Sequence, residues 1–379
     1  MALGDVLPFR YGKGLPQRVR SRSGEYAVVS SAGATDTHNQ ALTTGPSVVV
    51  GRKGSIGTVY YCPEPVWPID TAFYVEGSDE VDIRFAYFLL QSLPLKEMNN
   101  DSAVPGLNRA HAESLIIELP PTDVQASIAG VLGAFDDKIE SNRRAMQHLE
   151  DLGASILDQR LQFESSGLPV TDQDNRLGDY LSVCETGARP KGGASTDGSG
   201  VVSLGAESVQ SAGVMNIGTQ KTVPHAFAQS LKRGHLADRD VLVYKDGGKP
   251  GNFIPHVSAF GLGFPVAEAT INEHVYRVRG RDDVSQGLLY WVLRSHWMDD
   301  EMRRRGTGAA IPGLNSTNFK SLPWPAIERG DLLDLNPVLD SMLDALLRYG
   351  AENLRLAALR DALLPGLVSG GLQVSEIEG

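Results

Sequence analysis

Short apolar runs separated by turn residues occupy two long stretches of the chain. In the first stretch, Val, Ile, Tyr and Phe gather at Tyr26–Ser30, Val48–Val50, Val59–Tyr61 and Ala72–Val75, with Gly, Pro, Asn and Ser between the runs. Runs of this length and composition, bounded by turn residues, predict β-strands. A helical pattern at about Asp82–Ser92 interrupts them. We therefore expect an α+β domain.

A helical period follows this stretch. From Thr122, apolar residues recur at intervals of three, four and seven, at Ile128, Val131, Phe135, Ile139, Leu149, Leu152 and Ile156. These intervals place the apolar side chains on one face of a long helix. We expect Thr122 to be its N-cap, with Gln125 completing a capping box.

A second helical tract begins near Leu335. Its apolar residues are Leu339, Met342, Leu343, Leu346, Leu347, Leu354, Leu363 and Leu364. We expect Pro337 in the first turn, where its missing N–H is tolerated, and Pro365-Gly366 at the end. Each helix would hold about 30–40 residues and measure roughly 45–60 Å. Because so long an apolar stripe needs a partner, we predict that the two helices pack together; the alternative is that each covers only its own domain.

The tetrapeptide PGLN occurs twice, at Pro105–Asn108 and Pro312–Asn315. Further matching pairs occur in the same order: Leu3–Leu7 with Leu177–Leu181, Tyr11–Pro16 with Glu185–Pro190, Ser47–Gly57 with Asp240–Gly251, Pro68–Gly77 with Thr270–Gly280, and Ala86–Ser92 with Leu289–Ser295. This shared order predicts a long duplication and not a short solenoid period. The helix predicted at about Asp82–Ser92 should then have a counterpart at Val284–Asp299.

The net charge of −11 is unevenly distributed. Residues 120–165 carry 8 acidic and 4 basic side chains, and residues 326–379 carry 9 and 4, which leaves a net charge of −2 for the rest. A nearly neutral domain can still bind phosphates through one positive face. Two distant cysteines support neither a disulfide framework nor a zinc site. With no apolar run long enough to span a membrane, we expect a cytoplasmic protein with no membrane partner.

Motifs for catalysis are weak. No stretch fits the P-loop pattern, the histidines form no HxH or HExxH pair, and GxSxG is absent. The glycines of Gly51–Gly57 are better explained as a tight turn than as a nucleotide loop, and Phe260–Gly263 only faintly resembles an S-adenosylmethionine loop. We therefore expect a protein that binds, with no catalytic residue and no metal site.

Turns that carry basic residues are the best candidates for binding. Glycine allows close approach of the backbone, while Lys and Arg neutralise phosphates and can pair with guanine. The candidate DNA-binding residues are Tyr11, Lys13, Arg18, Arg20, Ser30, Ser31, His38, Arg52, Lys53 and Asn108 in the first copy, and Lys191, Lys245, Lys249, Arg303, Arg304 and Asn315 in the second. For each cation the alternative is an ordinary surface charge. For Asn108 and Asn315 it is a structural turn bonded to its own backbone.

Several of these segments together resemble the specificity subunit of type I restriction–modification systems. The resemblance rests on GRKGSIGTVYY and WPIDTAFYV, on PGLN in each half, on LPPTDVQASIAGVLGAFDDKIESNRRAMQHLEDL, and on LAALRDALLPGLVSG. The central helix of the family usually carries Glu-Gln, where this chain has Val124-Gln125, while Asp137–Glu140 keeps the family's DKIE. The second copy departs further, with YKDGGKPG in place of GRKGSIG.

The resemblance implies two tandem β-rich target recognition domains, each followed by a long helix, with the helices packed as an antiparallel coiled coil. The implied parts are recognition domains at 1–119 and 166–325, helices at 120–165 and 326–370 that space the domains and dock methyltransferases, and a tail at 371–379. Each recognition domain would read half of a bipartite site in double-stranded DNA.

The implied partners are two methyltransferase subunits, which hold S-adenosylmethionine, and restriction subunits, which use ATP and Mg²⁺. This chain would then need no cofactor and would serve phage defence without catalysing a reaction. Two other hypotheses are a self-contained restriction or methyltransferase enzyme with its own recognition domains, and a protein-scaffolding adaptor.

Overall fold

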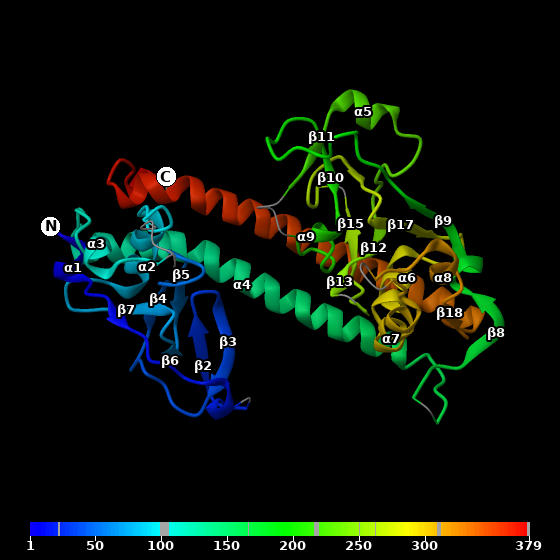
Figure 1. Ribbon diagram of the computed structural model, residues 1–379, viewed down its shortest axis with the longest axis horizontal. Helices are drawn as coiled ribbons and strands as arrows, with labels where there is room; N and C mark the ends of the chain where they lie inside the picture. The colour runs from blue at the N-terminus through cyan, green and yellow to red at the C-terminus, as the bar shows by residue number, and fades with distance from the viewer. Residues whose placement is uncertain are drawn as a thin grey trace. The chain divides into compact units, whose positions relative to one another are not determined.

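A computed structural model of the protein describes residues 1–21, 23–98, 106–165, 167–215, 220–249, 251–261, 263–308 and 312–376. The fold is mixed α+β, as predicted. The chain divides into two compact units, one formed by residues 1–138 and 356–379 and the other by residues 139–355 (Figure 1). The long helices α4 (Thr122–Asp158) and α9 (Arg329–Val368) each contribute to both units.

The first unit contains two sheets. Its elements before α4 are α1 (Leu3–Val6), β1 (Arg10–Tyr11), η1 (Gln17–Val19), β2 (Tyr26–Ser30), β3 (Gly33–His38), β4 (Ser47–Gly51), β5 (Val59–Cys62), β6 (Val66–Pro68), β7 (Ala72–Glu76), α2 (Ile83–Ser92) and α3 (Arg109–Glu113). One sheet has the order β1-β7-β4-β5 and the other β3-β2-β6. The four predicted strands and the helix α2 are confirmed within one or two residues.

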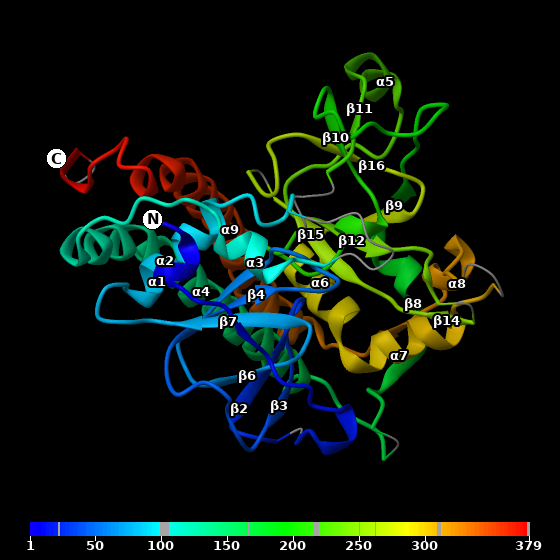
Figure 2. The same cartoon turned by 60° about the vertical axis from the view of Figure 1, so that its left-hand side comes forward.

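Helix α2 covers one face of the four-stranded sheet, and the three-stranded sheet covers the other (Figure 2). The alternation along β4 explains the layers. Val48 and Val50 pack with the apolar face of α2, whereas Val49 packs with residues of β2 and β6. Because successive strand side chains point to opposite faces, a strand that is apolar throughout is buried on both.

The second unit repeats this architecture. Its elements between α4 and α9 are β8 (Thr171–Arg176), η2 (Leu177–Tyr180), β9 (Leu181–Thr186), β10 (Val201–Leu204), η3 (Ala206–Ser208), β11 (Thr222–Val223), α5 (His225–Ser230), β12 (Asp240–Tyr244), β13 (Gly248–Lys249), β14 (Asn252–Phe253), β15 (Val257–Phe260), β16 (Ala269–Ile271), β17 (Val275–Gly280), α6 (Gln286–Arg294), α7 (His296–Arg305), α8 (Ser316–Lys320) and β18 (Pro323–Pro325). The short η5 (Val374–Glu376) follows α9.

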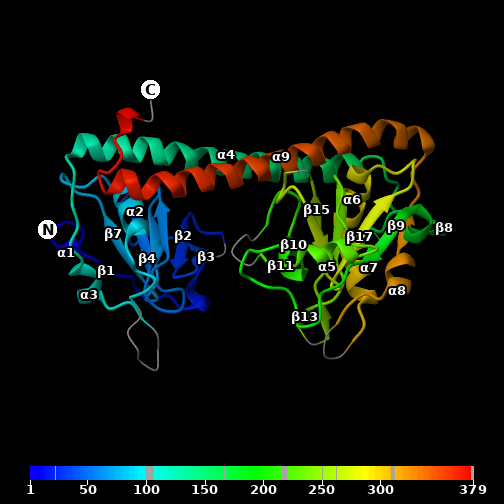
Figure 3. The ribbon, with the colours of Figure 1, turned by 90° about the horizontal axis from the view of Figure 1, so that it is seen from above.

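The strand orders confirm the duplication. The sheets β15-β12-β17-β9 and β11-β10-β16 have the same order as β5-β4-β7-β1 and β3-β2-β6, and β2 pairs parallel with β6 as β10 does with β16. In the second unit α6 lies between the four-stranded sheet and α9 (Figure 3). Helix α6 is therefore the counterpart of α2.

The strand pairing also aligns the two copies residue by residue. Tyr11 pairs with Phe73, and Thr186 pairs with Tyr276, so Tyr11 and Thr186 occupy equivalent positions. The next residue is glycine in both, Gly12 and Gly187. At each of these glycines a Cβ would overlap a backbone carbonyl oxygen, of Ile69 or Ile271. This structural alignment differs by one residue from the pairing of Tyr11–Pro16 with Glu185–Pro190 read from the sequence.

The predicted capping box at the start of α4 is wrong. Thr122 is the first residue of the helix, and the Gln125 side chain bonds to other groups. Its Oε1 accepts from the Asp82 amide at 2.9 Å, and its Nε2 donates to the carbonyls of Glu80 and Pro120, both at 2.9 Å. Gln125 is buried, so these bonds fix α4 to the turn before α2.

The two prolines predicted to mark the ends of α9 lie inside the helix instead. The helix begins at Arg329, which puts Pro337 in its interior, because Leu332 and Leu335 extend the apolar stripe by two turns. Leu333, whose carbonyl loses its helical partner to Pro337, lies on the exposed face. At the other end the helix passes through Pro365-Gly366, since Leu367 is still buried in the core. It stops before Gly370, which has φ +72°.

The helix predicted at Val284–Asp299 is two helices. Ser295, with ψ 149°, separates α6 from α7. Residues 287–293 of α6 are all buried, whereas α7 directs only Trp297, Met298 and Met302 into the core. The break lets a helix that is buried on every side continue as an amphipathic one.

Within the second unit α4 and α9 run antiparallel. Asn142 Nδ2 donates to Glu352 and Asn353 at 2.9 Å, while Arg160, just beyond α4, pairs with Asp331 at 2.6 Å. As the chain advances from Asn142 to Arg160, its partners in α9 move back from Asn353 to Asp331, which is the order of an antiparallel pair. In the first unit Leu364 and Leu367 of α9 share a core with Ile128 and Leu132 of α4. The predicted packing of the two helices is confirmed inside each unit.

Candidate functional site

Each PGLN motif is joined to the basic loop that follows the central strand of its sheet. In the first unit Leu107 N donates to Arg52 O at 2.9 Å, and Lys53 bridges to Gly106. In the second, Leu314 N donates to Lys245 O at 2.7 Å, and Asp246 bridges to Gly313.

We name these assemblies corner 1 and corner 2. Corner 1 consists of Tyr11, Arg52, Lys53 and residues 106–109, and corner 2 of Thr186, Lys245, Asp246 and residues 313–316. Pro105, the first residue of the first motif, lies outside the described residues. The duplicated motif thus brings a polar turn and a basic loop together in both units.

The asparagine of each motif caps a short helix. Asn108 Oδ1 accepts from His111 N at 3.1 Å at the start of α3, and Asn315 Oδ1 accepts from Asn318 N at 2.8 Å at the start of α8. Both side chains are exposed. The alternative role of these asparagines, a structural turn bonded to its own backbone, therefore accounts for the side-chain oxygen of each. Their contact with DNA stays a prediction.

Both corners lie at the end of the sheet that is remote from the long helices. Asp240 begins β12 beside Arg239, which pairs with Asp344 of α9 at 2.5 Å, and the strand then leads away to Lys245. In the first unit β7 leads from Phe73, near Arg52, toward Asp82, which Gln125 of α4 holds. In each unit the sheet therefore separates the corner from α4 and α9.

Corner 1 is a stack of cations on an exposed aromatic ring. Tyr11 is 52% exposed as a residue, and the guanidinium carbons of Arg52 and Arg109 lie 5.0 Å and 5.8 Å from the centroid of its ring. Arg52 also lies 5.7 Å from Phe73 and donates to Asp70 O at 3.1 Å. Arg109 Nε bonds to Glu113 at 2.9 Å. These contacts fix two cations at the surface.

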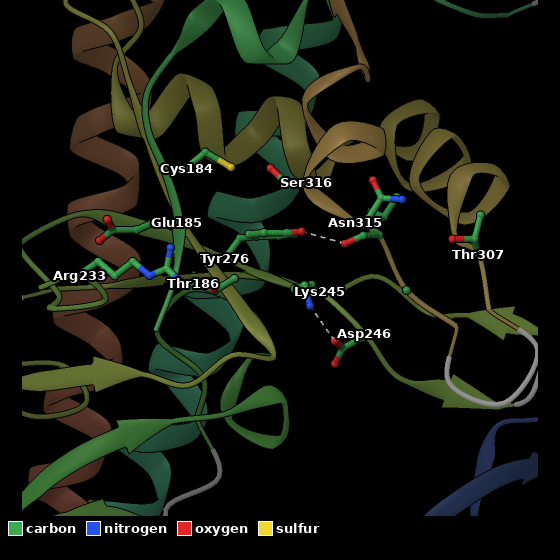
Figure 4. Close-up of a pocket in the computed structure, with 12 residues that line it drawn as sticks. Cys184, Glu185, Thr186, Arg233, Lys245, Asp246, Tyr276, Thr307, Asn315 and Ser316 are labelled. Carbon is green, nitrogen blue, oxygen red and sulfur yellow. Dashed lines mark hydrogen bonds and ion pairs between the residues drawn. The ribbon is translucent and has the colours of Figure 1, made fainter. Parts of the chain in front are cut away.

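Corner 2 borders a pocket of about 420 Å³ (Figure 4). Lys245 Nζ lies 3.1 Å from Asp246 Oδ2, and Asp246 Oδ1 lies 2.5 Å from His274 Nδ1. The Tyr276 hydroxyl donates to Leu314 O at 2.9 Å and so fastens the motif to β17; burial raises the pKa of this phenol. A carboxylate therefore occupies the place that Lys53 has in corner 1.

A charged chain extends from corner 2 toward a neighbouring loop. His274 Nε2 lies 3.1 Å from Arg189 Nη2, and Arg189 also pairs with Glu273. Burial acts to raise the pKa of Glu273, but the hydrogen bond and charge of Arg189, a backbone hydrogen bond and the charge of His274 together lower that pKa. Acidic groups thus neutralise much of the positive charge near corner 2.

The other predicted residues of the first unit are placed differently. Lys13 is exposed, with Nζ 5.9 Å from the Trp67 ring centroid, and Arg18 is exposed in η1. Arg20 donates to Leu15 O at 2.9 Å and lies 3.9 Å from Asp36. Ser30 and Ser31 are buried, and His38 packs edge-on against Trp67 at 5.4 Å. Only Lys13 and Arg18 of this set present charges openly.

In the second unit Lys191 is exposed, and the backbone of Lys249 belongs to β13, while its side chain lies outside the described part of the chain. Arg303 and Arg304 are exposed on the last turn of α7. Arg303 pairs with Asp299 at 2.5 Å, and Arg304 pairs with Glu301. Each of these two arginines is compensated within its own helix.

Sequence reasoning missed Arg109, Asp246 and His274. Arg109 directly follows PGLN and Asp246 directly follows Lys245, so a comparison of the residues adjoining each repeat would have found both. His274 lies 28 positions from its partner Asp246, and only the sheet brings them together.

No described helix is long and apolar enough to cross a membrane. No group of three or more His, Cys, Asp or Glu side chains in the described ranges could hold a metal ion.

Comparisons with known proteins identify relatives of the chain. Residues 1–151 match the family described as "Type I restriction modification DNA specificity domain". The S subunit of a type I restriction–modification system from M. genitalium is 16% identical with a TM-score of 0.56, covering 97% of this chain and 95% of its own. The fold is therefore that of this S subunit. A comparison with curated protein sequences gives no match.

Two further solved structures match at lower TM-scores. The HsdS subunit from Thermoanaerobacter tengcongensis is 16% identical with a TM-score of 0.31, covering 98% of this chain and 96% of its own. A chain from a study of complex assembly and conformational transition of the type I R-M system is 15% identical with a TM-score of 0.36, covering 98% and 97%.

Proposed function

We propose that this chain, whose first 151 residues match the type I restriction modification DNA specificity domain family, is the DNA-recognition subunit of a type I restriction–modification complex. The observation that carries the proposal is the duplicated corner. Two units of one strand order each present a polar turn joined to a basic loop. Two readers in one chain suit a target of two half-sites.

The differences between the corners favour unlike half-sites. Corner 1 presents Tyr11, Arg52 and Lys53, whereas the aligned positions of corner 2 hold Thr186, Lys245 and Asp246. Base edges are distinguished by the donors and acceptors placed against them. Readers with such different groups are expected to select different bases, which makes the target bipartite and asymmetric.

The long helices are proposed to dock two methyltransferase subunits. The segments 120–165 and 326–379 are net acidic, which disfavours DNA as their partner. Helix α9 also exposes Leu333 and Leu359, and α4 exposes Leu152. Apolar side chains amid acidic ones suit a protein partner. Methyl transfer, with S-adenosylmethionine, then belongs to that partner, and ATP- and Mg²⁺-dependent restriction to a further subunit.

Methylome sequencing tests this function. A host lacking its own type I system would carry this chain with its methyltransferase, and a control host the methyltransferase alone. We expect methyladenine in a two-part motif with a fixed gap, only when both proteins are present. A motif that persists in the control host, or no motif in either, would contradict the proposal. Methylation by the chain without its partner would indicate an enzyme instead.

A further inference from the structure

The exposed ring of Tyr11 holds two guanidinium groups that have few other partners. Arg52 and Arg109 lie 5.0 and 5.8 Å from the same centroid, one from the loop after β4 and the other from the residue after PGLN. Within the described residues, Arg109 bonds through Nε to Glu113, and its two terminal nitrogens have no protein acceptor. Arg52 uses Nη1 for the Asp70 carbonyl. Several N–H donors therefore remain available at this surface.

Glu113 is only a partial counter-charge for this pair. The same oxygen, Oε1, also accepts from the Phe9 amide at 2.7 Å, so Glu113 fastens β1 to α3 as well as orienting Arg109. No described carboxylate forms an ion pair with Arg52. The stack thus holds two cations and one carboxylate, which pairs with Arg109 alone, and it keeps a net positive charge.

The aligned corner of the second unit has none of the parts of this stack. Thr186 replaces Tyr11, Ser316 replaces Arg109, and Lys245, which replaces Arg52, is held at 3.1 Å by Asp246. The backbone bond from the leucine of the motif to the carbonyl of the loop cation is the same in both units, so these substitutions change the side chains on a shared frame.

We propose that Arg52 and Arg109, which both lie against the Tyr11 ring, form a phosphate clamp on the DNA backbone that exists only in the first unit. Corner 2 then contributes little to backbone binding. This inference rests on the proposed function and adds to it an unequal division of electrostatic binding between the two readers.

Phosphate is the ligand that the chemistry favours. A guanidinium offers planar, paired N–H donors that match phosphate oxygens, and stacking on a ring occupies its face while leaving the edge free. Tyr11 reduces the conformational freedom that each arginine must lose on binding. An interaction of this kind positions the duplex without reading its sequence.

Salt dependence of binding tests the clamp. Duplex DNA of random sequence would be titrated with the assembled complex of this chain and its methyltransferase, with wild type, Arg109→Gln and Arg52→Gln. Removing one arginine–phosphate interaction should reduce the slope of log K against log[salt] by about 0.9. We therefore expect a reduction of about 0.9 in each variant, with weaker binding to all sequences alike.

Arg281→Gln is the matched control. Arg281 also stacks on a tyrosine, 4.5 Å from the Tyr180 centroid, and pairs with a carboxylate, Asp283, at 2.7 Å, but it lies at the end of β17 remote from corner 2. Arg281→Gln removes the same charge as the other two substitutions and should leave the slope of log K against log[salt] unchanged. Tyr11→Phe, which retains the ring, should bind as wild type does, whereas Tyr11→Leu should weaken binding.

The outcomes separate the clamp from the function. If the wild-type complex binds DNA and the slope is the same in Arg109→Gln and Arg52→Gln, the clamp is disproved and the function stands. An equal reduction in Arg281→Gln would show an effect of net charge alone and would also disprove the clamp. If the wild-type complex binds no DNA, the proposed function fails and the clamp with it. Thermal melting of each variant shows whether Arg109→Gln remains folded.

Discussion

At the scale of single residues, the chemistry of PGLN is divided between structure and recognition. The carbonyl oxygens of the Asn108 and Asn315 side chains serve helix caps, which leaves the amide nitrogen of each exposed beside a basic loop. Serine can cap a helix as asparagine does but has no amide to offer a base. A substitution of asparagine by serine therefore separates helix capping from recognition of a base.

Substitution at Asn108 is therefore informative. We expect Asn108→Ala to lower the free energy of unfolding by about 0.5–2 kcal/mol, because the His111 amide loses its acceptor. Asn108→Ser should restore most of that stability but alter one half of the methylation motif, because serine has no amide to offer a base. Chemical denaturation and methylome sequencing measure the two effects. An altered half-site in a stable Asn108→Ser protein would show that the amide reads a base.

At the scale of elements, glycine decides how closely α4 can approach its neighbours. Gly153 faces the buried Trp291 of α6, and a Cβ there would overlap the indole ring. The same region holds Glu150, which accepts from the fully buried Tyr290 hydroxyl at 2.5 Å. Burial raises the pKa of Glu150, although Arg294 and this hydrogen bond act to lower it. Close packing thus fixes the contact between α4 and α6.

Two glycines in the same helix should respond in opposite ways to alanine. Gly153→Ala should lower the free energy of unfolding by about 1–3 kcal/mol, because Trp291 cannot move aside in a packed core. A Cβ added at Gly130 would lie in open space. Gly130→Ala should therefore raise the free energy of unfolding by about 0.5–1 kcal/mol through helix propensity. Denaturant titration of the full chain measures both. A stabilising Gly153→Ala would contradict the close packing of α4 on α6.

Local pattern predicted the elements well, and long-range contacts explain what it missed. The strands from Tyr26 to Val75 follow from short apolar runs bounded by turn residues that are close in sequence. Gln125 bonds to groups that lie 43 to 45 positions away, so the short-range rule of the capping box misplaced its partners. The pairing of Arg109 with Tyr11 needs the chain to return across the sheet, and no local pattern encodes that. The remaining site residues and the domain limits stay predictions.

At the scale of the whole molecule, the duplication preserves architecture while changing charge. Strand order, the Leu107 and Leu314 backbone bonds and the two asparagine caps are the same in both units. Against this constant frame, Asp246 stands where the first unit has Lys53. One carboxylate restrains Lys245 and lies against His274 at once, so this single position controls the charge of corner 2.

Asp246→Asn should make corner 2 bind the DNA backbone in a way that resembles corner 1. Removal of the carboxylate frees Lys245 for a phosphate, so we expect tighter binding of the assembled complex to random duplex at low salt. The salt slope should become steeper by up to about 0.9.

Asp283→Asn is the matched control, since it removes the same charge at the opposite end of β17, beside Arg281. Equal steepening in both variants would attribute the effect to net charge, whereas steepening in Asp246→Asn alone would assign it to Lys245. No change in either would mean that Lys245 does not approach a phosphate, and corner 2 would then recognise DNA through neutral groups such as Asn315.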